Sequence, residues 1–226
     1  GSFMANRIEG QGNFNWANED RYIGNFVAGR RSGKGKMLWH TGQTYEGEFL
    51  DGVLHGQGHL IYSDGRQYIG NFSAGQRSGK GTLYWPNGNR YVGTFVADDR
   101  SGLGVIHWRD GTIYRGEFSD NDQSGWGIKE RPGMTPEIQQ WRNGILQLRR
   151  PLKASKHCAL NHLQHQWMFE SDDCLNGLAN GEGLAVSLDG GMLVPQGKFI
   201  LGELVRGKVM RMPKLDRELS GESEGG

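Results

Sequence analysis

The sequence predicts an all-β fold, a single antiparallel meander of stacked β-hairpins with an open edge at each end. Three observations support this prediction: a motif that recurs every 23 residues, glycines at fixed places within each repeat, and aromatic residues in register with those glycines. A fixed period of this size is the signature of a repeat protein, in which each unit buries its apolar face against its neighbours.

Each repeat begins with the pattern Tyr-x-Gly-x-Phe. The pattern starts at five tyrosines that are 23 residues apart: Tyr22, Tyr45, Tyr68, Tyr91 and Tyr114. Because successive residues of a strand point to opposite faces, the Tyr, Gly and Phe of one motif share a face. The second half of a repeat, such as residues 33–39, is again extended and ends in β-forming residues. One repeat is therefore predicted to be one hairpin.

Two kinds of turn are expected in each repeat. Asp64-Gly65, Asn87-Gly88 and Asp110-Gly111 are dipeptides that favour tight hairpin turns with positive φ. The longer stretch at residues 29–33, which is rich in Arg, Ser and Gly, is predicted to form the other turn.

Equivalent residues of successive hairpins should line up as columns on the sheet. Two apolar columns are Phe26, Phe49, Phe72, Phe95 and Phe118, and Met37, Leu60, Leu83 and Ile106. A third column is our candidate partner-binding surface: Trp39, Tyr62, Trp85 and Trp108. Large aromatic residues dominate interface hot spots, although the same column would also serve as buried core. The sequence leaves both interpretations open.

The unit Tyr-x-Gly-x-Phe-x-x-Gly-x-x-x-Gly-x-Gly-x-x-x-x-x-(Asp/Asn)-Gly resembles the MORN repeat (membrane occupation and recognition nexus). The resemblance covers about residues 10–128 in five in-register copies. It implies an elongated, twisted β-sheet rod with a groove, used mostly to bind other proteins and for self-association. Some members of the family were proposed to bind phosphoinositide lipids, and the family has no catalytic residues to carry over.

Composition excludes several classes of function. The 226 residues include 38 glycines, 26 Lys+Arg and 25 Asp+Glu. This nearly balanced charge argues against nucleic acid as a partner, because binding to a phosphate backbone needs a basic surplus. No apolar run approaches the ~20 residues of a membrane-spanning helix. Taken with these exclusions, the resemblance to the MORN repeat implies a non-enzymatic binding or scaffold module that recognises a protein or peptide through its groove or aromatic face.

Two alternative partners remain open. Arg31, Arg77 and Arg100 recur at one repeat position, with Lys34 and Lys80 nearby, and a basic stripe of this kind would make a peripheral membrane adaptor that binds anionic phospholipid. In the alternative interpretation these residues bind nothing and form a solvent-exposed sheet edge, whose charges prevent pairing with other strands. A homodimer through an unpaired terminal hairpin is the second alternative.

No catalytic residue, cofactor or metal site is expected. The stretch 75–81 resembles a phosphate-binding loop, but it is one residue short and lacks the hydroxyl that would hold Mg²⁺. The segment 157–165 contains three histidines and Cys158, but the spacing matches no standard metal site.

The predicted domains follow the repeat pattern. They are a tag remnant and lead (1–9), the regular repeat array (10–128), a turn-rich, basic connecting segment (129–157), diverged MORN-like hairpins (158–212) and a disordered tail (213–226). Cys158 and Cys174 are predicted to form a disulfide if the protein is exported and to be buried thiols if it is cytosolic. We expect a cytoplasmic protein if Met4 is the native start, with export as the alternative.

Overall fold

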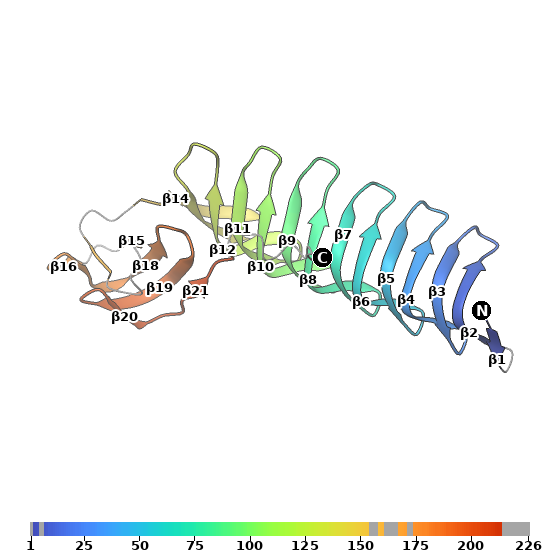
Figure 1. Cartoon of the computed structure of the whole chain (residues 1–226). Coiled ribbons are helices and arrows are strands. Elements are labelled where there is room, and N and C mark those ends of the chain that lie inside the picture. Colours follow the sequence, from blue (N-terminus) through green and yellow to red (C-terminus); the bar gives the residue numbers. More distant parts are fainter. Residues whose placement is uncertain (1, 5–6, 154–157, 161–166, 171–173, 214–226) are drawn as a thin grey trace, which may run out of the picture. The chain divides into compact units, whose positions relative to one another are not determined.

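The computed structural model describes residues 2–4, 7–153, 158–160, 167–170 and 174–213, and every regular element in these ranges is a β-strand (Figure 1). Fourteen strands form one sheet whose spatial order follows the chain from β1 to β14. The open antiparallel meander of hairpins predicted from the sequence is confirmed. The chain divides into two compact units, one made of the residues up to 102 with 106–109, the other of residues 103–105 and those from 110 onward.

The strands of the large sheet are β1 (Ser2–Met4), β2 (Arg7–Asn15), β3 (Arg21–Val27), β4 (Arg30–Leu38), β5 (Thr44–Leu50), β6 (Val53–Ile61), β7 (Gln67–Ser73), β8 (Gln76–Tyr84), β9 (Arg90–Val96), β10 (Asp99–His107), β11 (Ile113–Ser119), β12 (Asp122–Glu130), β13 (Glu137–Arg142) and β14 (Ile145–Pro151). The remaining strands are β15 (Trp167–Glu170), β16 (Cys174–Leu175), β17 (Leu178–Ala179), β18 (Gly181–Ser187), β19 (Met192–Ile200), β20 (Glu203–Arg206) and β21 (Met210–Arg211).

In the first unit a row of glycines crosses the sheet from strand to strand. Each glycine lies directly opposite the next in the strand register: Gly12, Gly24, Gly35, Gly47, Gly58, Gly70, Gly81 and Gly93. A tyrosine ring covers each pair, because a Cβ built on Gly58 would come within 2.5 Å of Cζ of Tyr45. The tyrosine hydroxyl then donates a hydrogen bond to a backbone carbonyl, as Tyr45 does to Glu48 at 2.9 Å. The glycines are therefore required for packing.

The tyrosines and phenylalanines of the motif form a continuous chain of edge-to-face contacts. Tyr45 contacts Phe49 of its own motif and Phe72 of the next motif, with ring centroids 5.1 and 5.2 Å apart. Tyr68 makes the same two contacts with Phe72 and Phe95. These rings are at most 4% exposed, and each edge-to-face pair adds about 0.5–1.5 kcal/mol beyond its area burial. The predicted phenylalanine column is therefore one half of the core.

The two turn types occur in the opposite places from those predicted. The tight two-residue turn is Ala28-Gly29, where both residues have positive φ (49° and 78°), and strand β4 begins immediately at Arg30. The stretch 29–33 that we expected to be a loop is therefore mostly strand. At the other edge, Asp64-Gly65 belongs to a three-residue loop in which Gly65 donates to the carbonyl of Tyr62 and only the glycine has positive φ.

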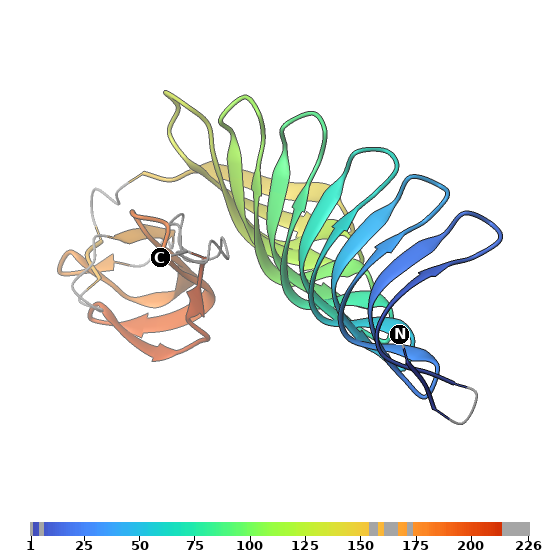
Figure 2. The same ribbon diagram turned by 45° about the vertical axis from the view of Figure 1, so that its right-hand side comes forward.

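A bulge bends each long strand. The register between β3 and β4 passes from Gly24 opposite Gly35 to Phe26 opposite Arg31, so β4 has two extra residues around Gly33, whose φ is 63°. A straight β4 would hold its first and last residues roughly 26 Å apart. The bend folds both ends of the hairpin around the tyrosines, which explains how a single sheet buries them completely. Figure 2 shows the bent hairpins of the first unit lying side by side.

The second unit contains a sixth, diverged hairpin of the large sheet. The 23-residue period continues through β13, where Gln139 lies opposite Gly127 in the glycine row and Trp141 takes the place of Phe118. Trp141 keeps the edge-to-face contact with Tyr114, at 6.3 Å. We had expected residues 129–157 to be a turn-rich connecting segment. The structure instead places β13 and β14 there. The prediction was wrong because this repeat has lost the Tyr and Gly of the motif, while the register of the sheet persists.

A smaller sheet, β15-β18-β19-β20 with β21 paired to β19, packs on β12 and β13 within the same unit. The shared core contains Ile128, Ile138, Leu152, Met168, Leu184, Val186, Leu193 and Met212. Buried Arg115 donates to Glu130 and to the carbonyls of Asp189 and Pro213, and so ties β11 to the small sheet. Turns with two positive-φ residues recur at Asn176-Gly177 and Leu201-Gly202, as in the regular repeats.

We predict that Gly58→Ala destabilises the protein by about 1–3 kcal/mol, the usual effect of overpacking, because the new methyl group overlaps the Tyr45 ring. Urea denaturation measures the change. Gly42→Ala is the control for a glycine substitution without a clash, since Gly42 has no atom within 4 Å; its φ of 86°, unlike the backbone of Gly58, adds a cost that does not involve Tyr45. In a Tyr45→Leu background the Gly58→Ala penalty should shrink and the Gly42→Ala penalty should not. Equal penalties in both backgrounds would contradict the ring-over-glycine packing.

The buried tyrosines also predict an alkaline limit to stability. Burial raises the pKa of Tyr45 from 10.0 to about 12, and the Glu48 carboxylate adds to the rise. The folded state therefore retains a proton that the unfolded chain releases above pH ~10, so the free energy of unfolding should be constant below pH ~10 and fall between pH ~10 and ~12. Urea midpoints across this range measure the fall, which Tyr45→Phe should reduce. Tyrosinate absorbance from the folded protein at pH 10 equal to that of free tyrosine would overturn the prediction.

Candidate functional site

Five half-buried aromatic residues form a row at one edge of the first unit, and we call this row the aromatic ladder. Its rungs are Trp16, Trp39, Tyr62, Trp85 and Trp108. The hydrogen-bonded loops show one geometry: in the loop after β6 the N–H of Tyr62 donates to the carbonyl of Arg66, and its own carbonyl accepts from Gly65. The same pair of bonds holds Trp39 to Gln43 and Gly42, and Trp85 to Asn89 and Gly88. The rungs are therefore set by the loop at the end of each hairpin.

Neighbouring loops are also joined to each other. The backbone N–H of His40 donates to the Asp20 carboxylate at 2.8 Å, and the N–H of Arg109 donates to the Asn89 side chain at 3.0 Å. A carboxylate or amide in one loop thus fixes the residue that follows the rung in the next. The His40 and Asp20 side chains are themselves 2.9 Å apart, and these hydrogen bonds lower the pKa of Asp20. The rungs are held at the spacing of the hairpins.

Arginine guanidinium groups stack against the ladder rings. Arg31 lies over Trp16 at 5.8 Å and Arg100 over Trp85 at 5.7 Å, and these arginines occupy the same repeat position. Arg66 lies over Tyr62 at 4.8 Å. Contacts of this kind restrain the ring and add cation–π attraction. The sequence showed the arginine column and the aromatic column, but their contact depends on the bend of the strands and was not predicted. Trp16 was also missed as a rung, since it belongs to an incomplete first repeat.

The arginines of the predicted basic stripe are engaged within the protein. Arg31 donates to the backbone carbonyl of Gly52, and Arg77 bonds the side chain and carbonyl of Asp98, with Nε 3.0 Å from the carboxylate. We had placed these residues in the longer turn. They lie in β4, β8 and β10, because the tight turn ends one residue before each of these strands.

The lysines of the same stripe are exposed and do not share the surface of the arginines. Lys34 lines a groove of about 770 Å³ over the glycine row, together with Lys36, Glu46, Glu48 and His59. Arg31 instead lines a hollow of about 520 Å³ with Trp16, Trp39 and Met37. In the groove Lys36 pairs with Glu46 at 3.3 Å, so positive and negative side chains alternate there. Lys80 occupies the position of Lys34 two hairpins further along.

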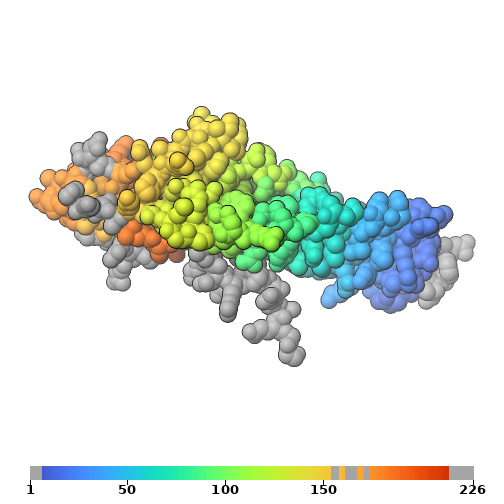
Figure 3. Space-filling model, turned by 90° about the horizontal axis from the view of Figure 1, so that it is seen from above, coloured from blue at the N-terminus to red at the C-terminus, as the bar shows by residue number. Residues whose placement is uncertain are grey.

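Charges around the aromatic ladder are balanced. Four arginines and four carboxylates lie in its loops or stack on its rings: Arg31, Arg66, Arg100 and Arg109, and Glu19, Asp20, Asp64 and Asp110. Arg66 pairs with Asp64 at 2.7 Å, and Arg77 with Asp98 at 3.0 Å. The ladder is therefore an aromatic surface without a surplus of either charge. Figure 3 shows the repeats of the first unit as successive bands from blue to green.

Comparison with known families identifies the repeat. The model of the MORN repeat matches five times, at residues 1–21, 22–44, 45–65, 68–90 and 91–113. The chain is a MORN repeat protein. MORN repeats are modules that bind proteins or membranes, and the family is a binding and scaffold repeat. No curated protein matches the chain.

The solved structures that resemble the chain include the TCP domain of SAS-4 from Drosophila melanogaster in complex with a proline-rich motif of Ana2, and this resemblance is weak. The two chains are 16% identical, and the match covers 66% of the MORN repeat protein and 96% of the TCP domain, with a TM-score of 0.35. That score is too low to carry an argument about fold or ligand.

Metal ligands and membrane-spanning helices can be assessed in the part of the chain that the structure describes. No three His, Cys, Asp or Glu side chains there are grouped so that they would hold a metal ion. His157, His162 and His165 lie outside the described residues. In the same described ranges there is no helix that is long and apolar enough to cross a membrane.

The structure joins Cys158 and Cys174 in a disulfide, with Cα atoms 5.6 Å apart. Cys174 belongs to the small β16–β17 pair, and Ala159 bridges to Leu178 of the same pair. The disulfide thus holds the segment 158–160 against a two-stranded sheet that has few other contacts.

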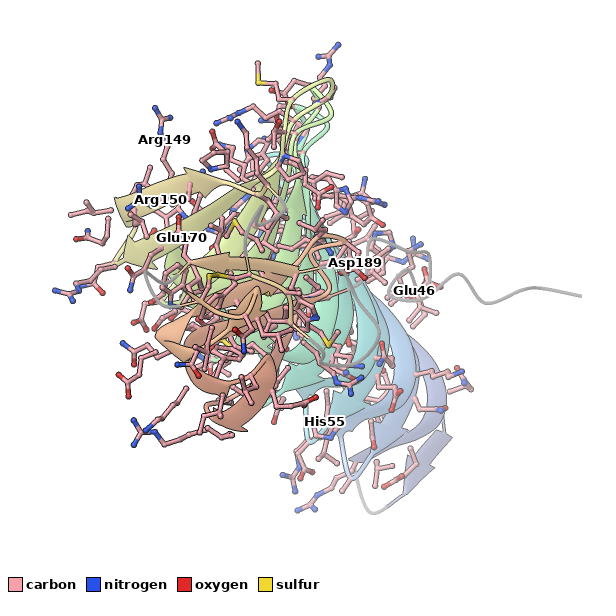
Figure 4. All side chains as sticks on the ribbon, turned by 90° about the vertical axis from the view of Figure 1, so that its left-hand side faces the viewer. Glu46, His55, Arg149, Arg150, Glu170 and Asp189 are labelled. Carbon is pink, nitrogen blue, oxygen red and sulfur yellow. A yellow bond between two sulfur atoms is a disulfide. The ribbon has the colours of Figure 1, made fainter. Side chains whose placement is uncertain are left out.

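In the same unit, exposed Arg150 of β14 pairs with Glu170 of β15 at 3.4 Å (Figure 4).

We predict that Cys174→Ser lowers the free energy of unfolding by about 3 kcal/mol, the loop-closure entropy of a disulfide of this span. Thermal denaturation of the second unit measures the loss. Reduction of the unaltered protein should reproduce it, and reduction of the variant should change nothing. Alkylation of both thiols in the folded, unreduced protein would contradict the disulfide.

Proposed function

We propose that this MORN repeat protein is a non-enzymatic binding module that takes a protein or peptide partner on its aromatic ladder. One observation carries the proposal. On the aromatic side of the first unit the motif tyrosines and phenylalanines are at most 4% exposed, while all five ladder residues remain half-buried. If the ladder residues belonged to the core, they would be buried as completely as these tyrosines and phenylalanines. Large aromatic rings that stay accessible in a fixed row are typical of interface anchors.

Preorganisation supports the same proposal. The rings of Trp16, Tyr62 and Trp85 are held by stacked arginines, and the loops that carry the rungs are joined by hydrogen bonds from His40 and Arg109. A partner would lose little free energy in ordering these side chains, since they are ordered already.

A lipid surface fits the same residues less well. An anionic headgroup needs cations that are free to approach it, but Arg31 and Arg77 donate to carbonyl and carboxylate oxygens of the protein. Lys34 lies on the groove with Glu46 and Glu48. Anionic vesicles are therefore the comparison partner in the test, and they should sediment little of the protein at any salt concentration.

We predict that Trp85→Ala weakens partner binding roughly 30-fold or more while the protein stays folded, because removal of a hot-spot aromatic residue costs about 2 kcal/mol or more. The partner is a peptide selected from an unbiased display library against the full chain. Calorimetry measures its affinity, and circular dichroism with a thermal scan checks the fold.

Ile69→Ala is the matched control, since Ile69 is an apolar residue, 42% exposed, that lines the groove over the glycine row and not the ladder. Its affinity should equal that of the unaltered protein. Selected peptides that bind Trp85→Ala and Trp39→Ala without loss would overturn the proposal, and salt-sensitive sedimentation with anionic vesicles would favour the lipid surface instead.

A further inference from the structure

The spacing of the aromatic ladder identifies the conformation of peptide that it fits. Each rung follows the second strand of its hairpin, so consecutive rungs are separated by two strands of the sheet. Strands lie about 4.8 Å apart, which sets the rungs about 9.6 Å apart along a line that crosses the strands. A bound peptide that uses more than one rung must repeat at this distance.

Among regular peptide conformations, polyproline II has this repeat. It rises about 3.1 Å per residue with three residues per turn, so every third side chain points the same way at intervals of about 9.3 Å. An extended β-strand returns to the same face every ~6.7 Å and an α-helix advances ~5.4 Å per turn, and neither distance matches the rungs. A polyproline II peptide would therefore stay in register with all five rungs.

The chemistry of the ladder agrees with such a peptide. The indole N–H groups of Trp16, Trp39 and Trp85 donate no hydrogen bond within the described part of the chain. Proline-containing peptides offer backbone carbonyl acceptors and few N–H donors. Because the charges around the ladder are balanced and largely paired, an uncharged peptide is the complementary one. Aromatic-lined grooves are a common way to recognise polyproline II segments.

The hollow between the first two rungs shows where a side chain would enter. It has a volume of about 520 Å³, and its lining includes Trp16, Trp39, Met37 and Arg31 together with Asn18 and Asp20. The apolar residue at the position of Met37 recurs as Leu60, Leu83 and Ile106 in the following hairpins. The aromatic and apolar positions that line this hollow therefore recur in the following repeats.

We propose that the aromatic ladder binds an uncharged polyproline II segment that presents proline at every third residue, one residue per rung. This inference rests on the proposed function, because it names the partner of the same ladder. Five rungs span about 38 Å, which a 13-residue polyproline II segment covers.

The test uses synthetic peptides with the full chain and follows tryptophan fluorescence and calorimetric affinity. The probe contains four Pro-Gln-Ala repeats and a fifth proline. A control peptide has the same composition with irregular proline spacing. Shorter and longer versions of the probe have 4, 7, 10 and 16 residues. We expect affinity to rise roughly two- to tenfold with each added repeat up to 13 residues and then to level off. The irregular peptide should bind no better than the 4-residue probe.

Variants connect the result to the rungs. Trp39→Ala and Trp85→Ala should each weaken binding of the 13-residue probe by about the affinity that one added repeat contributes. Ile69→Ala should leave the affinities of all the probes unchanged. Equal binding of the regular and irregular peptides would overturn the period of three. If only display-selected peptides without this period bind, and they need Trp85, the polyproline inference fails while the proposed function stands. Preference for an acidic peptide or for anionic vesicles would likewise overturn the inference.

Discussion

The structure depends on one packing arrangement, a tyrosine ring that lies flat across two opposed glycines. A single-layer sheet has no second layer to bury its apolar face, so the ring must be covered by the sheet itself. This requires glycine on both strands, since a Cβ on either Gly70 or Gly81 would come within 2.7 Å of Cζ of Tyr68. It also requires the bend at Gly33 and its equivalents, which brings the ends of each hairpin around the ring. The repeat length and the glycine spacing follow from these two needs.

Much of the fold could be predicted because this arrangement is local and periodic. The 23-residue period, the shared face of Tyr22, Gly24 and Phe26, and the column order all follow from spacing and strand alternation. The turns could not be predicted in the same way. Asp64-Gly65 has the composition of a two-residue turn but lies in a three-residue loop. Ala28 has no sequence signal for its positive φ. The conformations of both turns are set by the strand register across the bulge. The bulge in turn depends on the packing of the tyrosine ring, which the local sequence of a turn does not show.

The candidate site was predictable in its residues and not in its geometry. Trp39 and its equivalents could be found as a column, but their half-burial depends on the strand bend. The stacking of Arg31 over Trp16 joins residues 15 positions apart and is visible only when the hairpin is folded. Beyond residue 128 the motif is lost, because Gln139 replaces the glycine and Glu137 replaces the tyrosine. The strand is still retained there, since Trp141 keeps the aromatic contact.

The two faces of the sheet are subject to different packing constraints. On the aromatic side, the Tyr, Gly and Phe positions are nearly fixed by packing. On the other side, the residue after the tyrosine is free to change: it is Ile23, Glu46, Ile69, Val92 and Arg115 in successive repeats. At Arg115 the change adds a buried cation that pairs with Glu130 and donates a hydrogen bond to the carbonyl of Asp189. The same sheet face thus carries the chain's own second sheet in one unit and an open, charge-alternating groove in the other, while the aromatic ladder keeps its spacing because the core beneath it cannot change.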